Sequence, residues 1–382
     1  MEFKNVISIN GPVVLAKGNA DFAMHDMVYI GEEKLLGEVI KLEEDIAVIQ
    51  VYESTNGLKI GEKVISDGKS LSVTLAPGLL GEIFDGIQRP LKELKNLSGD
   101  FIKKGIVPSK VSLEKKWNFK KCVELYQRVE SGTIIGEVQE TTAISHKIMI
   151  PNNIFGEIIE IVENGEYAVN DIICKVKDNK NNVHEITMIQ EWPIRIGRPY
   201  EQRLSNTELF ITGQRVLDSL FPMAKGGTAM IPGGFGTGKT MLQHQLAKWS
   251  NADIIVYIGC GERGNEMTDV LDEFQNLIDP KTGRPLIERT ILIANTSNMP
   301  VAAREASIYT GLTMAEYYRD MGYDVAIMAD STSRWAEALR EISGRLEEMP
   351  AEEGYPSYLP SRLSEFYGRA GMVKNSNGTK GS

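Results

Sequence analysis

The sequence predicts a β-rich N-terminal half followed by an α/β domain with a mainly parallel sheet. Two observations predict this division. Up to about residue 190, short β-branched runs alternate with Gly, Pro and Asn turns, a pattern typical of small antiparallel sheets. From about residue 195, apolar runs of strand length alternate with segments of helical period. That alternation indicates parallel strands with helices on both faces of the sheet.

Residues 1–75 are predicted to form a small β-barrel. Their β-branched runs at 3–9, 27–30 and 46–51 are separated by turns such as Asn10-Gly11-Pro12. Residues 76–105 are expected to be a connector, because Pro77-Gly78 and Arg89-Pro90 are turn signals.

Residues 106–190 are predicted to form a second β-rich unit. Strands are expected at 133–138 and 154–159, and the polar tract 177–182 is expected to be an exposed hairpin tip. The pattern apolar-Gly-Glu-apolar recurs here and earlier without a fixed period. It therefore indicates that the same kind of turn is used several times in β structure, and it does not indicate a solenoid repeat.

Residues 191–382 are assigned to the α/β domain. The expected elements are strands at 228–231, 254–258, 290–294 and 325–329, and helices at 241–249, 267–277 and 301–321.

The composition excludes several classes of protein. A net charge of −10 argues against nucleic acid as the main partner, because phosphate binding depends on clustered Lys and Arg. Three distant cysteines, Cys122, Cys174 and Cys260, argue against a disulfide framework and favour a reducing cytosol. The longest apolar stretches fall far below the ~18 residues of a membrane-spanning helix, and the N-terminus lacks the features of a secretory signal.

A glycine-rich loop lies between the first predicted strand of the α/β domain and its helix. It fits the pattern G-x-x-x-x-G-K-[ST], in which backbone N–H groups and the helix N-terminus bind phosphate. In this pattern Lys239 reaches the β and γ phosphates and the Thr240 hydroxyl holds Mg²⁺. A plain Gly-rich turn is the alternative, and the strand–loop–helix context argues against it. The loop comprises Gly233, Gly234, Phe235, Gly236, Thr237, Gly238, Lys239 and Thr240.

Two acidic residues follow other predicted strands. Asp330 ends the apolar run 325–329, where a carboxylate is placed to hold a Mg²⁺-bound water, although an Asp here is also a common helix N-cap. Glu262 lies in a Gly-flanked loop after strand 254–258, facing the same crevice in a parallel sheet. We expect it to orient and deprotonate a water in line with the γ phosphate. First-turn helix acids are the alternative reading for Glu262 and Glu266.

Arg334 lies one helical turn after Asp330. Its possible roles are a salt bridge to Glu262, contact with phosphate, or a surface pair with Glu337. The four histidines show no ligand spacing, so no transition metal is assigned.

These motifs together resemble the catalytic A subunit (alpha chain) of V-type and archaeal-type ATP synthases. The resemblance covers nearly the whole chain and extends beyond the glycine-rich loop. The motifs that carry it are Ser8-Ile9-Asn10-Gly11-Pro12-Val13-Val14, residues 77–91, Trp192-Pro193-Ile194-Arg195, residues 212–218, residues 261–266 and residues 330–338.

The resemblance implies a RecA-like P-loop nucleotide domain, preceded by an N-terminal β-barrel and by an inserted bulge domain at 106–190. It implies ATP or ADP and Mg²⁺ as ligands, and ATP turnover coupled to stalk rotation and to H⁺ or Na⁺ transport. The implied partners are B subunits that alternate with A subunits in a hexamer and supply an arginine finger, together with central and peripheral stalk subunits. The implied location is the cytoplasmic face of the membrane, contacted only indirectly.

Site roles also follow from the resemblance. It implies that Glu262 activates water, that Lys239 and Thr240 bind phosphate and Mg²⁺, and that Asp330 belongs to the metal shell. It implies that Arg263 and Arg334 support the region of the γ-phosphate.

The chain departs from the family pattern in two places. Gly234 stands where many relatives have proline, which leaves the phosphate-binding glycines in place. The sequence also ends at Ser382, before the further core strands and the C-terminal helical domain of the family. We therefore expect a fragment whose nucleotide domain is incomplete and which does not support rotary coupling alone.

Other functions are kept as alternatives. The first alternative is an assembly protein that binds a nucleotide without hydrolysing it. The second is a different hexameric RecA-like ATPase, such as an F-type beta subunit or a protein-export ATPase. The insertion at 106–190 argues against the second.

Overall fold

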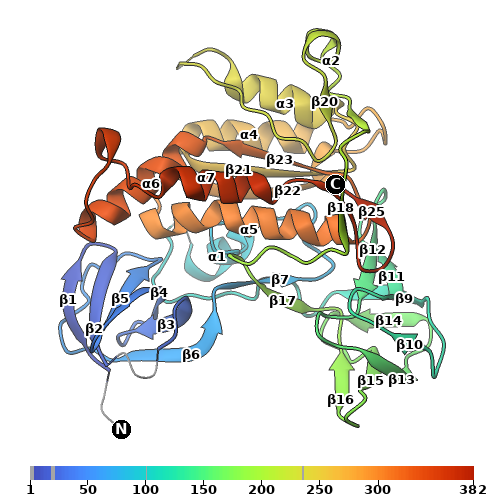
Figure 1. Ribbon diagram of the computed structural model, residues 1–382, viewed down its shortest axis with the longest axis horizontal. Helices are drawn as coiled ribbons and strands as arrows, with labels where there is room; N and C mark the ends of the chain where they lie inside the picture. Colours follow the sequence, from blue (N-terminus) through green and yellow to red (C-terminus); the bar gives the residue numbers. More distant parts are fainter. Residues whose placement is uncertain (1–3, 19–21, 100, 235) are drawn as a thin grey trace.

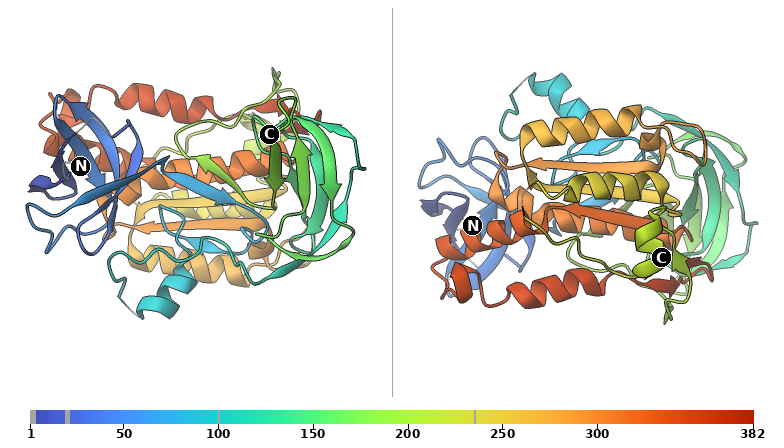
Figure 2. Two further views of the ribbon diagram at one scale, coloured as in Figure 1. Left: turned by 90° about the horizontal axis from the view of Figure 1, so that it is seen from below. Right: turned by 90° about the horizontal axis from the view of Figure 1, so that it is seen from above.

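The computed structural model describes residues 4–18, 22–99, 101–234 and 236–382. An antiparallel barrel lies under one end of an α/β domain and a two-sheet sandwich lies under the other end (Figure 1). The strand pair β7 (Ser72–Leu75) and β17 (Gln190–Pro193) runs between the barrel and the sandwich. The same arrangement is seen from below and from above in Figure 2.

The barrel is a six-stranded sheet of order β1-β2-β5-β4-β3-β6. An isolated antiparallel bridge between Asn5 and Lys63 brings its two edges together. Alternate residues of β3 are buried, so the β-branched side chains of Val28 and Ile30 fill the interior of the barrel. The strands are β1 (Val6–Asn10), β2 (Val13–Lys17), β3 (Asp26–Ile30), β4 (Leu35–Glu43), β5 (Ile46–Val51) and β6 (Val64–Ser70).

The sandwich consists of two antiparallel four-stranded sheets of order β10-β13-β15-β16 and β12-β11-β9-β14. The polar tract 177–182 lies at the turn between β15 and β16, as predicted. The strands are β9 (Lys116–Lys121), β10 (Arg128–Val129), β11 (Ile134–Gln139), β12 (Ser145–Met149), β13 (Gly156–Ile161), β14 (Gly165–Ala168), β15 (Cys174–Lys177) and β16 (Val183–Ile186).

The α/β domain contains a parallel sheet of order β23-β21-β22-β8. Its strands are β8 (Ile83–Phe84), β21 (Ile254–Glu262), β22 (Thr290–Thr296) and β23 (Val325–Asp330). The last three confirm predicted strands. β8 lies inside the predicted connector, which means that the connector contributes a strand to the sheet.

Helices cover both faces of this sheet, as predicted (Figure 1). Along β21, Ile254, Val256 and Ile258 belong to the core shared with α5, whereas Ile255 and Tyr257 belong to the core shared with α4. This division follows from the two-residue period of a strand. The helices concerned are α3 (Lys239–Trp249), α4 (Gly264–Asn276) and α5 (Val301–Asp320).

The remaining elements connect or flank these layers. The helices are α1 (Leu91–Ser98), α2 (Arg215–Leu220), η1 (Leu286–Arg289), α6 (Thr332–Arg345), η2 (Glu352–Gly354) and α7 (Leu359–Gly368). The strands are β18 (Gln202–Leu204), β19 (Leu209–Phe210), β20 (Met223–Ala224), β24 (Met372–Lys374) and β25 (Lys380–Gly381).

The predicted strand at Thr228–Ile231 is wrong. This segment has no regular secondary structure, and Met230 is 69% exposed. A strand requires a neighbouring strand for its backbone N–H and C=O groups. In the described part of the chain, no strand pairs with this segment, and the sheet ends on β23.

A cluster of buried ion pairs joins the barrel to the α/β domain. The Arg195 guanidinium donates to both carboxylate oxygens of Glu38 in β4 at 2.7 and 2.9 Å, and to both of Glu305 in α5 at 3.0 and 2.9 Å. Tyr52 also donates to Glu38, and His25 Nδ1 lies 2.7 Å from it. Burial opposes ionisation of Glu38, yet Arg195 and these hydrogen bonds lower its pKa to about 2.

Arg195→Met is expected to lower the free energy of unfolding by about 3–5 kcal/mol, because it leaves two buried carboxylates without their cation. Urea unfolding followed by circular dichroism measures this change. Arg362→Met is the control, because the Arg362–Glu365 pair is exposed and spans 3.5 Å, and its loss should cost under about 1 kcal/mol. Equal losses in the two variants would contradict the structural role assigned to Arg195.

Candidate functional site

The glycine-rich loop leads directly into α3, as the sequence predicts. Gly238 is the N-cap of α3 with φ +83°, a left-handed conformation that glycine adopts without a steric penalty. A Cβ added at Gly233 would lie 2.6 Å from Thr237 Oγ1, so the turn has no room for a side chain there. Phe235 lies outside the described residues. The loop therefore presents backbone next to a helix N-terminus, the geometry that binds anions.

The Lys239 ammonium folds back onto the loop. It donates to the carbonyl oxygens of Gly233 and Gly234 at 2.8 and 2.7 Å. Thr237 Oγ1 also donates to the Gly234 carbonyl, at 2.9 Å. A positive charge is thus held over the turn that the motif assigns to phosphate.

Thr240 and Asp330 meet across the sheet edge. Thr240 Oγ1, in the first turn of α3, donates to Asp330 Oδ2 at 2.7 Å, and the Tyr257 hydroxyl donates to the same oxygen at 3.0 Å. A hydroxyl and a carboxylate are hard oxygen ligands, and Mg²⁺ is commonly bound by one or two carboxylates together with phosphate and water. The residues present therefore fit Mg²⁺. The described residues contain no group of three or more His, Cys, Asp or Glu that suits a metal bound by protein side chains alone.

Glu262 ends β21 at the same edge of the sheet. The preceding Gly261 has φ +104°, and a Cβ there would lie 2.7 Å from Arg304 Cδ. Arg304, which is 9% exposed, donates to the Ser297 carbonyl at 2.9 Å, and the Ser297 N–H donates to the Glu262 carbonyl at 2.8 Å. The loop that carries Glu262 is therefore supported by β22 and α5.

The Glu262 carboxyl has a pKa raised to about 7. Burial is the largest cause, followed by a hydrogen bond with Glu266 and by the negative charges of Asp330 and Glu266. Arg334 acts in the opposite direction. A general base works best when its pKa lies near the operating pH, so this environment suits proton transfer.

Each of the two predicted arginines lies close to an acidic residue of the helix that follows its strand. Arg263 is the N-cap of α4, and its Nη1 lies 4.0 Å from Glu266 Oε1. Arg334 Nη1 lies 3.0 Å from Glu337 Oε2, so the surface pair among the sequence alternatives is present. Glu262 still contributes to the raised pKa of Arg334, which places both charges in one electrostatic environment.

Sequence reasoning missed Tyr257 and Arg304. Tyr257 looks like an ordinary aromatic residue of a buried strand, and Arg304 like a surface charge of a helix. The signal available for Arg304 was the glycine at 261, which leaves space for a neighbouring side chain. Cys260 is buried, and burial raises the pKa of its thiol to about 12.

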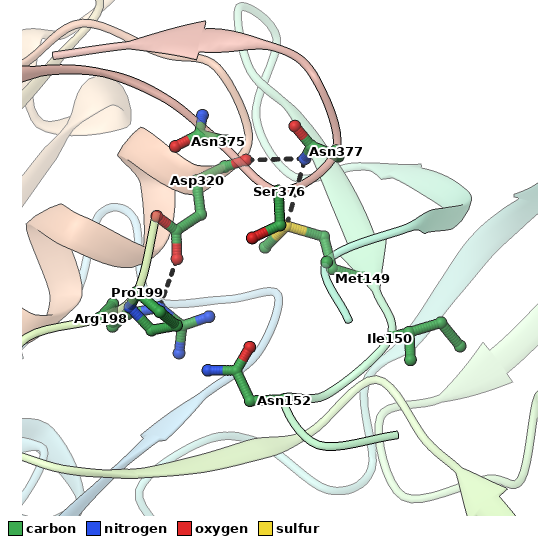
Figure 3. A pocket seen from close by; sticks show the side chains of 10 residues that line it. Met149, Ile150, Asn152, Arg198, Pro199, Asp320, Asn375, Ser376 and Asn377 are labelled. Atoms are coloured by element: carbon green, nitrogen blue, oxygen red, sulfur yellow. Dashed lines mark hydrogen bonds and ion pairs between the residues drawn. The ribbon is translucent and has the colours of Figure 1, made fainter. Parts of the chain in front are cut away.

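The cavity drawn in Figure 3 shares no lining residue with this edge. Its volume is about 20 Å³, enough for one water and far too small for a nucleotide. Arg198 Nε donates to Asp320 at 2.6 Å beside it, and Asn377 donates to the Asp320 carbonyl at 2.9 Å. This cavity therefore belongs to the junction of the sandwich with α5. It is lined by Gly132, Met149, Ile150, Asn152, Arg198, Pro199, Asp320, Asn375, Ser376 and Asn377.

The fold and the site define a P-loop protein, in which a glycine-rich loop leads into α3 and acidic residues lie at the carboxyl edge of the adjoining parallel sheet. Family comparison agrees with this description. Residues 213–382 match the nucleotide-binding domain of the ATP synthase alpha/beta family, 108–195 match the alpha/beta subunit barrel-sandwich domain, and 6–68 match the family's beta-barrel domain. The predicted fold class is confirmed. In the described parts of the chain, no helix has the length and apolar character needed to cross a bilayer.

The chain belongs to the ATP synthase alpha/beta family and is a homologue of the A subunit (alpha chain) of V-type and A-type ATP synthases. It is 62% identical to V-type ATP synthase alpha chain 2 of Clostridium tetani, over 99% of this chain and 64% of that relative. It is also 62% identical to the A subunit of the A-type ATP synthase of Methanopyrus kandleri, over 96% of this chain and 62% of that relative. The chain thus spans less than two thirds of the length of these curated relatives.

A solved structure shares the fold. The ATPase EscN of the type III secretion system of enteropathogenic E. coli superposes with a TM-score of 0.63 at 22% identity, over 98% of this chain and 67% of that chain.

Glu262→Gln is expected to change how stability depends on pH. Between pH about 4.5 and 7 the folded chain retains a proton that the unfolded chain has released, so the free energy of unfolding of the unaltered chain falls as pH rises. Glutamine removes this dependence. The variant should be more stable at pH 8 by about 1–2 kcal/mol, allowing for solvent screening, and unchanged at pH 4.

Urea unfolding at the two pH values measures this difference. Glu130→Gln is the control, because Glu130 is exposed in the sandwich. A gain at pH 8 shared by both variants would show that total charge, and not the environment of Glu262, causes the effect.

Proposed function

We propose that this chain is the catalytic subunit of a rotary V/A-type ATP synthase, coupling ATP turnover to H⁺ or Na⁺ transport across a membrane. One observation carries the proposal. The Thr240 hydroxyl and the Asp330 carboxylate lie 2.7 Å apart at the sheet edge where Glu262 also ends its strand. The identity of 62% to the A subunit of an A-type ATP synthase supports the same assignment.

The P-loop binds the phosphates of ATP or ADP in this proposal. Backbone N–H groups of the loop and the N-terminus of α3 surround the phosphate oxygens, and the Lys239 ammonium moves from the loop carbonyls to the β and γ phosphates. The contacting residues are Gly233, Gly234, Phe235, Gly236, Thr237, Gly238, Lys239 and Thr240.

Thr240 would hold Mg²⁺ through its hydroxyl, and Asp330 through a bound water. Held by these two residues, Mg²⁺ would supply positive charge beside the phosphate oxygens. Tyr257 keeps the Asp330 carboxylate oriented through the hydrogen bond of 3.0 Å.

Glu262 is the general base. It orients a water in line with the γ phosphate and accepts the proton that this water loses as its oxygen bonds to the γ phosphorus, while the bond from that phosphorus to the bridging oxygen breaks and ADP leaves. Arg263 and Arg334 contribute positive charge around the γ phosphate, and Arg304 holds the backbone of the loop in place as a positioning residue.

The proposed partners follow from the family. B subunits alternate with A subunits in a hexamer and supply an arginine finger across the interface, and central and peripheral stalk subunits connect the hexamer to the rotor. The chain then lies on the cytoplasmic face of the membrane and contacts the membrane only through other subunits.

A nucleotide-binding protein that does not hydrolyse ATP is the second candidate. The observation that favours it is the exposure of residues 228–230 and their lack of a strand partner, which leaves the entry to the P-loop outside the sheet. Binding and turnover therefore need separate measurements.

Isothermal titration of the chain with ATP and Mg²⁺ tests binding. We expect Lys239→Ala to weaken binding at least about tenfold through the lost charge, and Glu262→Gln to leave it within a factor of about three. Lys248→Ala, on the same helix but at its C-terminal end, is the control and should bind normally.

Steady-state ATP hydrolysis with B and stalk subunits then separates the two candidates. The catalytic role predicts turnover that Glu262→Gln reduces by about 100-fold or more. Normal binding with no turnover in the unaltered chain would favour the second candidate, and equal turnover in the Glu262→Gln variant would remove Glu262 from the mechanism.

A further inference from the structure

A buried histidine lies on the same face of α3 as Thr240. His244 follows Thr240 by four residues, so the two side chains are neighbours on one face of the helix. Thr240 contacts Asp330, and the centroid of the His244 ring lies 5.8 Å from that of the Tyr257 ring. His244 is only 3% exposed. One face of α3 thus contacts both Asp330 and the tyrosine that donates to it.

The rings of His244, Tyr257 and Phe274 form a cluster in which each ring contacts the other two. The Phe274 centroid lies 5.4 Å from that of His244, at an interplanar angle of 89°, and 5.4 Å from that of Tyr257, at 58°. Such edge-to-face and tilted contacts are favourable arrangements of aromatic pairs. The cluster joins β21 to α3 and α4, the two helices on one side of the sheet (Figure 1). Close packing on two sides limits how far the Tyr257 ring can turn.

Glu273 of α4 determines how the His244 ring is oriented. Its Oε2 lies 2.5 Å from His244 Nδ1. His244 Nε2 is buried and has no hydrogen-bond partner among the described residues. The contact with Glu273 is therefore the polar interaction that fixes this ring, and hydrogen bonds to an ionised group are among the stronger ones.

We propose that His244 is a positioning residue for the Mg²⁺ site and that it acts through Tyr257. Glu273 orients the His244 ring, which packs against the Tyr257 ring. The Tyr257 hydroxyl then donates to Asp330 Oδ2 at 3.0 Å. Partners that orient a metal-binding group from behind typically change metal affinity by about 10- to 100-fold when they are removed. The inference rests on the proposed function, because it concerns the Mg²⁺ that Thr240 and Asp330 would hold.

The Mg²⁺-dependent part of ATP binding tests this role without a measurement of turnover. ATP is titrated calorimetrically into the whole chain, once with Mg²⁺ and once with EDTA, and the ratio of the two affinities is the Mg²⁺ effect. Tyr257→Phe keeps the ring and removes only the hydroxyl, and it should lower the Mg²⁺ effect about tenfold. His244→Leu should lower it at least about fivefold and leave ATP binding in EDTA within a factor of about two.

The double variant separates positioning from packing. If His244 acts through the Tyr257 hydroxyl, His244→Leu should change the Mg²⁺ effect by less than about twofold when it is introduced into the Tyr257→Phe variant. If His244 only packs α3 against α4, the two losses are independent and multiply.

Glu273→Leu repeats the test in case circular dichroism shows that His244→Leu does not fold. The Glu273 side chain is 30% exposed, so its replacement leaves the core unchanged, and the Mg²⁺ effect should fall as it does in His244→Leu. Glu273→Gln keeps an oxygen that accepts from Nδ1 and should recover most of the loss. Asp272→Leu, at the exposed neighbouring position of α4, is the matched control and should leave the Mg²⁺ effect unchanged.

Two results would overturn this inference and leave the proposed function intact. The first is an unchanged Mg²⁺ effect in both His244→Leu and Glu273→Leu. The second is a double variant in which the two losses multiply. If the unaltered chain did not bind ATP, or bound it equally well with Mg²⁺ and with EDTA, the Mg²⁺ site and the proposed function would fail together with the inference.

Discussion

The burial of α5 on all sides is the constraint on which the structure depends. Nearly every residue of this helix is buried, between the parallel sheet on one side and the barrel and sandwich on the other (Figure 1). A polar group in such a helix has no water to bind, so it must be paired within the protein. Glu305 binds Arg195, Glu316 binds Arg369 at 2.7 Å, and the Tyr318 hydroxyl donates to Glu140 at 2.9 Å. Each of these pairs joins α5 to another part of the chain, so one helix orients the barrel and the sandwich together.

The fold was predictable wherever local pattern determines structure. β21 and β22 are buried on both faces and β23 is half-buried, and such strands read as continuous apolar runs. The bounds of α5 were predictable almost to the residue, but its burial was not, because Glu305 and Glu316 look like surface residues until their partners are known. The segment 228–231 has the same apolar character as the other strands. It is not a strand because strand formation requires a paired edge, and sequence pattern carries no information about which edge is available.

The same distinction applies to the candidate site. The contact between Thr240 and Asp330 was predictable, because the threonine of the glycine-rich motif and an acid at the carboxyl end of a buried strand are expected at one edge of the sheet. The place of Glu262 at that edge follows from the same rule. Tyr257 and Arg304 were not predictable, because packing between distant elements brings them to the site. For Arg334 the sequence offered Glu262 and Glu337 as partners, and helical spacing of three residues favours Glu337.

Consecutive residues of α5 connect the site to the barrel. Arg304 lies against Gly261 and binds the Ser297 carbonyl, which supports the loop that carries Glu262. Glu305, the next residue, binds Arg195 and through it Glu38 of the barrel. Two consecutive residues of α5 therefore support the loop that carries Glu262 and bind the barrel, and a buried helix with fixed side-chain partners holds both contacts in one packed unit.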